Sequence, residues 1–102
     1  MIKVNVIYDN ILDDADIIAV SDEIASNIEK LGQVFLRWVT STEAALEPEY
    51  YRFTNENGET SVVAETVGFI KWLNERYSPQ DEPAYIITAN TNYQEGLLNI
   101  EF

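Results

Sequence analysis

Carboxylates are the most abundant side chains in this sequence that could carry acid–base chemistry. The chain has 18 Asp and Glu residues but neither His nor Cys, which excludes thiol catalysis, disulfide bonds and the usual zinc ligands. No Ser stands three residues before a Lys, and the four glycines are too dispersed for a phosphate-binding loop. A carboxylate pair could hydrolyse a glycoside, but among so many acids such pairs are uninformative. We therefore expect no enzyme and no cofactor.

The densest acidic cluster comprises Asp9, Asp13, Asp14 and Asp16. Carboxylate oxygens suit calcium or magnesium, but this spacing is wrong for an EF-hand, because apolar residues fall where such a loop should turn. Acids are also favoured at the positive end of a helix dipole. We therefore expect a solvated cluster at the start of a helix and no metal site.

The overall charge is strongly negative. Six Lys and Arg residues against 18 acids give a net charge of −12, which disfavours direct binding to nucleic acid or to an anionic membrane. No apolar run is long enough to cross a bilayer, and no secretion signal follows Met1, so we expect a cytoplasmic protein. Because self-repulsion opposes compact folding, the excess charge serves either solubility or a basic partner.

Two elements are predicted near the start of the chain. Alternating apolar residues indicate a strand over Ile2–Tyr8. Apolar residues at spacings of three and four then predict a helix over Asp14–Leu31. A competing interpretation makes Ile17–Val20 a short strand, with Ser21 capping a shorter helix. Periodicity leaves both interpretations open.

The later elements complete an α+β pattern within one domain, residues 1–102. In chain order we expect a strand Val34–Thr40, a loop over 41–48, a strand Tyr50–Thr54 and a turn Asn55–Gly58. Residues Thr60–Ala64 form either a hairpin strand or a helix. A helix from Thr66 that ends before Pro79 follows, and then the strands Ala84–Ala89 and Leu97–Phe102. This order predicts a two-layer sandwich: one mixed or antiparallel sheet of four to six strands, with two helices packed on one face.

Acids and tyrosines supply the candidate partner-binding residues. Carboxylates spaced along a strand or helix can approximate a row of phosphates, and Tyr is enriched where interfaces concentrate their binding energy. The candidates are Asp13, Asp14, Asp16, Glu47, Glu49, Tyr50, Tyr51, Glu56, Glu59, Tyr93 and Glu95.

These features lead to two alternative expectations of function. The first is a small acidic inhibitor that binds the basic surface of a nuclease or another nucleic-acid-binding protein, as a mimic of DNA. Phage anti-restriction and anti-CRISPR proteins and nuclease-toxin immunity proteins share its small size and acidity, but the likeness is one of composition only. The second is a regulatory or adaptor domain that binds a protein through an apolar face or strand edge. A homodimer through a free strand edge also remains open.

Overall fold

The four-stranded sheet of this protein is mixed. The computed structural model describes residues 1–8, 11–41, 52–62 and 64–102, with the backbone alone at 11–13, 52–54 and 60–62. The strands β1 (Ile2–Tyr8), β2 (Ile11–Val20), β5 (Tyr85–Thr91) and β6 (Leu98–Glu101) form the sheet in the order β5-β2-β1-β6. β2 is antiparallel to both of its neighbours, whereas β6 is parallel to β1.

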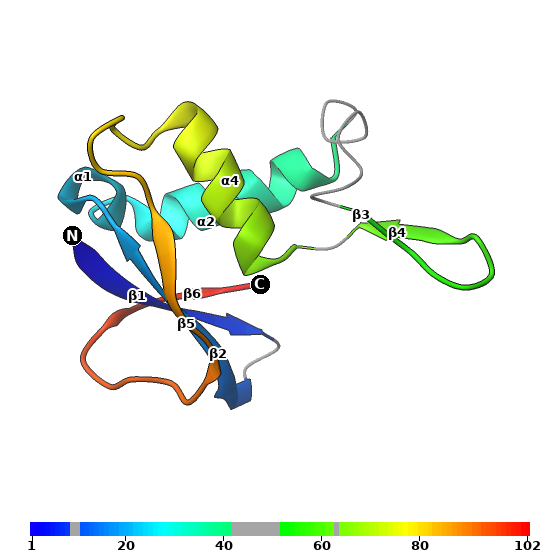
Figure 1. Cartoon of the computed structure of the whole chain (residues 1–102), viewed down its shortest axis with the longest axis horizontal. Helices are drawn as coiled ribbons and strands as arrows, with labels where there is room; N and C mark the ends of the chain where they lie inside the picture. The colour runs from blue at the N-terminus through cyan, green and yellow to red at the C-terminus, as the bar shows by residue number, and fades with distance from the viewer. Residues whose placement is uncertain (9–10, 42–51, 63) are drawn as a thin grey trace.

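Helices cover one face of this sheet (Figure 1). The short α1 (Asp22–Ala25) leads into α2 (Ile28–Val39), and α4 (Thr66–Arg76) packs beside α2. The fold is therefore α+β, as the sequence predicts: one mixed four-stranded sheet with two main helices packed on it.

An aromatic cluster fills the space between the helices and the sheet. Phe35 of α2 lies 5.3 Å from Phe69 and 5.4 Å from Trp72 of α4, measured between ring centroids. All three side chains are buried, and they pack above the inward-facing Val4 and Val6 of β1. Aromatic residues bury large areas and favour such tilted pairs, so this cluster joins α2 to α4 over the sheet.

On the opposite face of β1, Asn5 is buried, with 0% of its surface exposed. β5 and β6 lie at opposite edges of the sheet, so the connection 92–97 has to cross it. The Asn5 amide donates to the carbonyl of Gln94 (2.8 Å) and to Oδ1 of Asn99 (2.9 Å), and its oxygen accepts from the Gln94 N–H (3.0 Å). Asn5 therefore fastens the crossing connection to the centre of the sheet.

Several predicted elements are confirmed. The strand Ile2–Tyr8 is β1, the helix from Thr66 is α4, and the last two predicted strands correspond to β5 and β6. The hairpin interpretation of residues 60–64 is confirmed by β4 (Thr60–Val62).

The β3–β4 hairpin forms a separate two-stranded sheet. β3 (Arg52–Thr54) pairs with β4 across the predicted turn, where Oδ1 of Asn55 accepts from the N–H groups of Asn57 and Glu59, both at 3.0 Å. Gly58 has a φ of 80°, which favours glycine. Residues 42–48 of the loop predicted over 41–48, and the first two residues of the strand predicted over Tyr50–Thr54, lie outside the described residues.

The predicted helix Asp14–Leu31 is wrong in its first part, whereas its residues 22–25 and 28–31 are helical, in α1 and α2. Residues 14–20 belong to β2, and Ser21 caps α1 by accepting from the N–H of Ile24 at 3.3 Å, as the competing interpretation has it. Residues 15–20 are all buried, and since successive residues of a strand point to opposite faces, this part of β2 is covered on both faces. A strand buried on both faces loses the alternation that distinguishes it from a helix.

The predicted strand Val34–Thr40 is also wrong, because residues 34–39 are the second half of α2. Their β-branched and aromatic side chains favour a strand locally. Burial instead follows the helical spacing, with Leu31, Phe35 and Val39 facing the core. Tertiary packing therefore overrides local preference here.

No helix among residues 1–8, 11–41, 52–62 and 64–102 is long and apolar enough to cross a membrane.

The role of Asn5 can be tested by Asn5→Ala, with Asn99→Ala as the control. Asn5→Ala leaves both backbone groups of Gln94 without their partner, so the free energy of unfolding should fall by about 2–3 kcal/mol. Asn99 is exposed and loses one bond, so its replacement should lower that free energy by about 1 kcal/mol or less. Urea unfolding measures both values. Equal losses would contradict the role assigned to Asn5.

Candidate functional site

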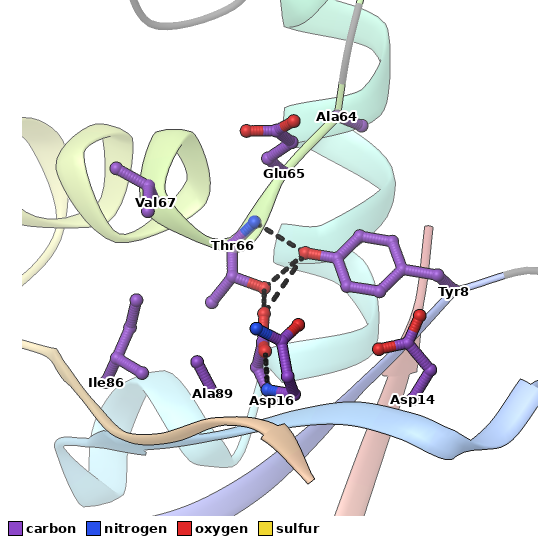
Figure 2. A pocket seen from close by; sticks show the side chains of 10 residues that line it. Tyr8, Asp14, Asp16, Ala64, Glu65, Thr66, Val67, Ile86 and Ala89 are labelled. Carbon is purple, nitrogen blue, oxygen red and sulfur yellow. Dashed lines mark hydrogen bonds between the residues drawn. The ribbon is translucent and has the colours of Figure 1, made fainter.

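A hollow of about 480 Å³ opens where the start of α4 meets the sheet. Figure 2 shows side chains from β1, β2, α4 and β5 converging on it. Its lining residues are Tyr8, Asp14, Asp16, Ala64, Glu65, Thr66, Val67, Ile86, Ala89 and Asn90. Because three of them are carboxylates and none is a Lys or Arg, we refer to it as the acidic hollow.

A hydrogen-bonded cluster of Tyr8, Thr66 and Asp16 forms the floor of the acidic hollow (Figure 2). The N–H of Thr66 donates to the Tyr8 phenol oxygen at 2.7 Å, and the Tyr8 and Thr66 hydroxyls are bonded to each other. The Thr66 hydroxyl donates to Oδ2 of Asp16 at 2.5 Å. The backbone N–H of Asn90 donates to Oδ1 of Asp16 at 3.0 Å. The cluster thus joins β1, β2, β5 and α4.

Local sequence explains why α4 needs this cluster. Its N-cap residue, Glu65, makes no side-chain capping bond, so the Tyr8 phenol oxygen accepts one of the N–H groups that the first turn leaves unpaired. The carboxylate of Asp16 lies beside this helix start, where the dipole favours negative charge. Asn90 adopts a φ of 52°, a conformation that Asn tolerates better than most residues.

A hydroxyl beside a carboxylate is an arrangement that can activate a nucleophile. Here, however, the Thr66 side chain is 2% exposed and its hydroxyl is bonded to both Tyr8 and Asp16. A substrate cannot reach it in this conformation, so the geometry supports a structural role for the cluster. Within the described part of the chain, no group of three or more Asp or Glu side chains is arranged to hold a metal ion.

The rim of the acidic hollow carries charge that no ion pair among the described residues neutralises. Asp14 and Glu65 are exposed, and neither forms an ion pair with a described residue. Ion pairs of the described chain lie elsewhere, between Lys71 and Glu75 and, at 4.0 Å, between the amino group of Met1 and Asp22. Unpaired carboxylates around a concave surface concentrate negative potential there.

The structure distributes the predicted partner-binding residues over separate regions. Asp14 and Asp16 share the acidic hollow, although Asp16 is only 9% exposed. Other described candidates lie in the hairpin turn and in the β5–β6 connection: Glu56, Glu59, Tyr93 and Glu95. The candidates Glu47, Glu49, Tyr50 and Tyr51, and the side chain of Asp13, lie outside the described residues.

Sequence reasoning missed three polar residues of the acidic hollow: Glu65, Thr66 and Asn90. The sequence predicts a helix from Thr66 and a strand that ends at Tyr8, and it assigns no element to Glu65. The cluster joins residues 58 positions apart, Tyr8 and Thr66, and 74 positions apart, Asp16 and Asn90. No local pattern in a single sequence reveals such contacts.

Comparison with known proteins finds no matching protein family, no similar curated protein and no similar solved structure.

The cluster makes Tyr8→Phe a test with a distinctive pH dependence. At neutral pH this change should lower the free energy of unfolding by about 1–2 kcal/mol, because Thr66 loses its bonds to the phenol oxygen. Burial raises the pKa of Tyr8 above its ordinary value of 10.0. The unfolded chain therefore releases the phenol proton first, so the stabilisation is complete below about pH 10 and is lost as pH rises through the folded pKa.

Urea unfolding between about pH 7 and pH 11 would show the difference from wild type shrinking at the alkaline end. Tyr85→Phe is the control, because the Tyr85 side chain is exposed and is not part of the cluster. A difference that stays constant through pH 11 would contradict the buried-phenol explanation.

Proposed function

We propose that this protein is a small acidic inhibitor that binds the basic surface of a nuclease or another nucleic-acid-binding protein. The observation that carries the proposal is the acidic hollow. Within the described part of the chain, its exposed Asp14 and Glu65 form no ion pair, and no Lys or Arg lines the cavity. A Lys or Arg side chain of the partner would enter this cavity and form charge-assisted hydrogen bonds with both carboxylates.

The charge of the whole chain supports the same partner. A net charge of −12 attracts a positively charged surface over a long range and accelerates encounter with it. Such a surface is what a nucleic-acid-binding protein presents to phosphates. The inhibitor would occupy it as a mimic of DNA, without binding nucleic acid or membrane itself. A cytoplasmic location belongs to this proposal, because it brings the chain together with such partners.

The β3–β4 hairpin offers a second acidic contact. It extends away from the helices and the main sheet (Figure 1), and its turn carries the exposed Glu56 and Glu59. A narrow projection with acids at its tip can enter a groove that otherwise holds a nucleic-acid strand. We therefore include both residues in the proposed partner surface.

Affinity capture from a cell lysate tests the partner class. The bound protein is washed at about 50 mM and then about 500 mM salt, since screening weakens complexes held by complementary surface charge. A recovered nuclease or nucleic-acid-binding protein that elutes as salt rises, and that duplex DNA displaces, would support the inhibitor. A neutral partner that resists salt and ignores DNA would support the adaptor alternative and contradict the proposal.

Charge reversal tests the acidic hollow itself. The double variant Asp14→Lys/Glu65→Lys should weaken binding to the recovered partner by roughly tenfold or more, mainly by removing attraction to its cations. The control, Asp81→Lys/Glu82→Lys, makes the same change in net charge in the exposed turn beyond the other end of α4. Titration calorimetry compares the two. Equal weakening would show that only net charge matters and would contradict a specific role for the hollow.

A further inference from the structure

β5 forms a free edge of the sheet. Among the described strands it pairs with β2 alone. Two large apolar side chains of β5 are exposed at this edge, Tyr85 by 52% and Ile87 by 41%. Tyr85 lies opposite Ala19 of β2, whereas Ile86 lies opposite the core residue Ile18. Tyr85 and Ile87 therefore lie on the outer face, away from the helices.

The same edge lacks the charges that usually protect exposed strands. Residues 83–94 form an uncharged run of twelve residues, and the next longest such run in the chain, 31–36, has only six. Edge strands of soluble proteins are commonly protected by charged side chains, because their free N–H and C=O groups pair readily with another strand. In a chain with 24 charged residues, the longest uncharged run thus coincides with a free edge.

We propose that a second copy of this chain pairs with the edge, β5 against β5, to form a homodimer with one continuous sheet. An antiparallel pair of identical strands is self-complementary about a two-fold axis. If that axis passes through Ile86, Tyr85 of each copy faces Ile87 of the other. Pairs of aromatic and β-branched residues are favourable across antiparallel strands, and no like charges face each other within the paired segment.

The geometry of β5 sets the strength of this dimer. Ile87 is an extra residue relative to β2, because Ile86 pairs with Ile18 and Thr88 with Ile17. Such a bulge bends the strand, and beyond it the backbone at Asn90 turns toward Asp16. The paired segment is therefore short and the dimer weak. Repulsion between two chains of charge −12 opposes it further, so added salt should strengthen the dimer, opposite to its effect on a basic partner.

Sedimentation equilibrium at about 50 mM and about 500 mM salt tests the proposal on the full chain. The wild type should show a concentration-dependent dimer that is more populated at high salt. Ile87→Glu replaces the apolar partner of Tyr85 in each copy and brings two carboxylates into diagonal positions across the two-fold axis, so it should raise the dimer dissociation constant by roughly tenfold or more. Leu98→Glu is the matched control: Leu98 is 45% exposed on β6, at the opposite edge of the sheet, and the change in net charge is identical.

Each outcome decides the proposal. A dimer that Ile87→Glu weakens clearly more than Leu98→Glu does would support it. A wild type that stays monomeric at every concentration and at both salt levels would overturn it. Equal weakening by both variants, or by neither, would also overturn it, since another surface or net charge alone would then govern association. The proposal would also be overturned if the chain is monomeric and Ile87→Glu abolishes binding of a different protein, because β5 would then pair with a strand of that protein.

Circular dichroism and urea unfolding check that the Ile87→Glu chain folds like the wild type. Tyr85→Glu provides an independent second variant at the same edge, and it should weaken the dimer to a similar extent. Added salt should strengthen the dimer and weaken the complex with a basic partner. The two proposals can therefore be tested separately, and the failure of one does not prevent the test of the other.

Discussion

The arrangement of the elements around the acidic hollow depends on the buried carboxylate of Asp16. A buried charge is strongly unfavourable unless it is hydrogen-bonded, and this one accepts from Thr66 of α4 and from Asn90 of β5. The start of α4 therefore has to lie against β2, and β5 has to bend toward it. The exposed Asp14 and Glu65 are brought to one rim as a consequence of this internal contact.

Sequence periodicity predicted the elements in which residue types repeat with a regular period. α4 has a buried and an exposed side that repeat with the helical period. In β1 the alternation is one of residue type alone, because residues 4–7 are buried on both faces of the sheet. β2 was assigned wrongly, because residues 15–20 are buried on both faces and resemble a helix core as much as a strand. In α2, the locally strand-like residues 34–39 were misassigned, since packing against Phe69 and Trp72 decides their conformation. The α+β class was still predicted correctly. One wrongly assigned segment, residues 14–20, is a strand in place of a helix, and the other, residues 34–39, is a helix in place of a strand, so the result is still a sheet covered by helices.

The candidate site was less predictable than the fold. Net charge can be counted from the sequence, but the positions of the charges in space depend on contacts between residues far apart in the chain. Asp14 and Asp16 were singled out for their density, yet the structure gives them different environments: Asp14 is exposed, and Asp16 is buried at the floor of the acidic hollow. Glu65 had no local signal at all, and it reaches the site only because Tyr8 holds the start of α4.

The parallel pairing of β1 with β6 has a consequence for how the chain folds. Val4 pairs with Leu98 and Val6 with Ile100, so two of the most distant segments of the chain must meet before the sheet is complete. Contacts of such long sequence separation form late and slow folding. During synthesis, β1 and β2 emerge long before β6, and until it arrives one side of β1 keeps its backbone groups unpaired. Newly made chains are therefore most prone to aggregate in this interval, and it ends only when the last strand docks.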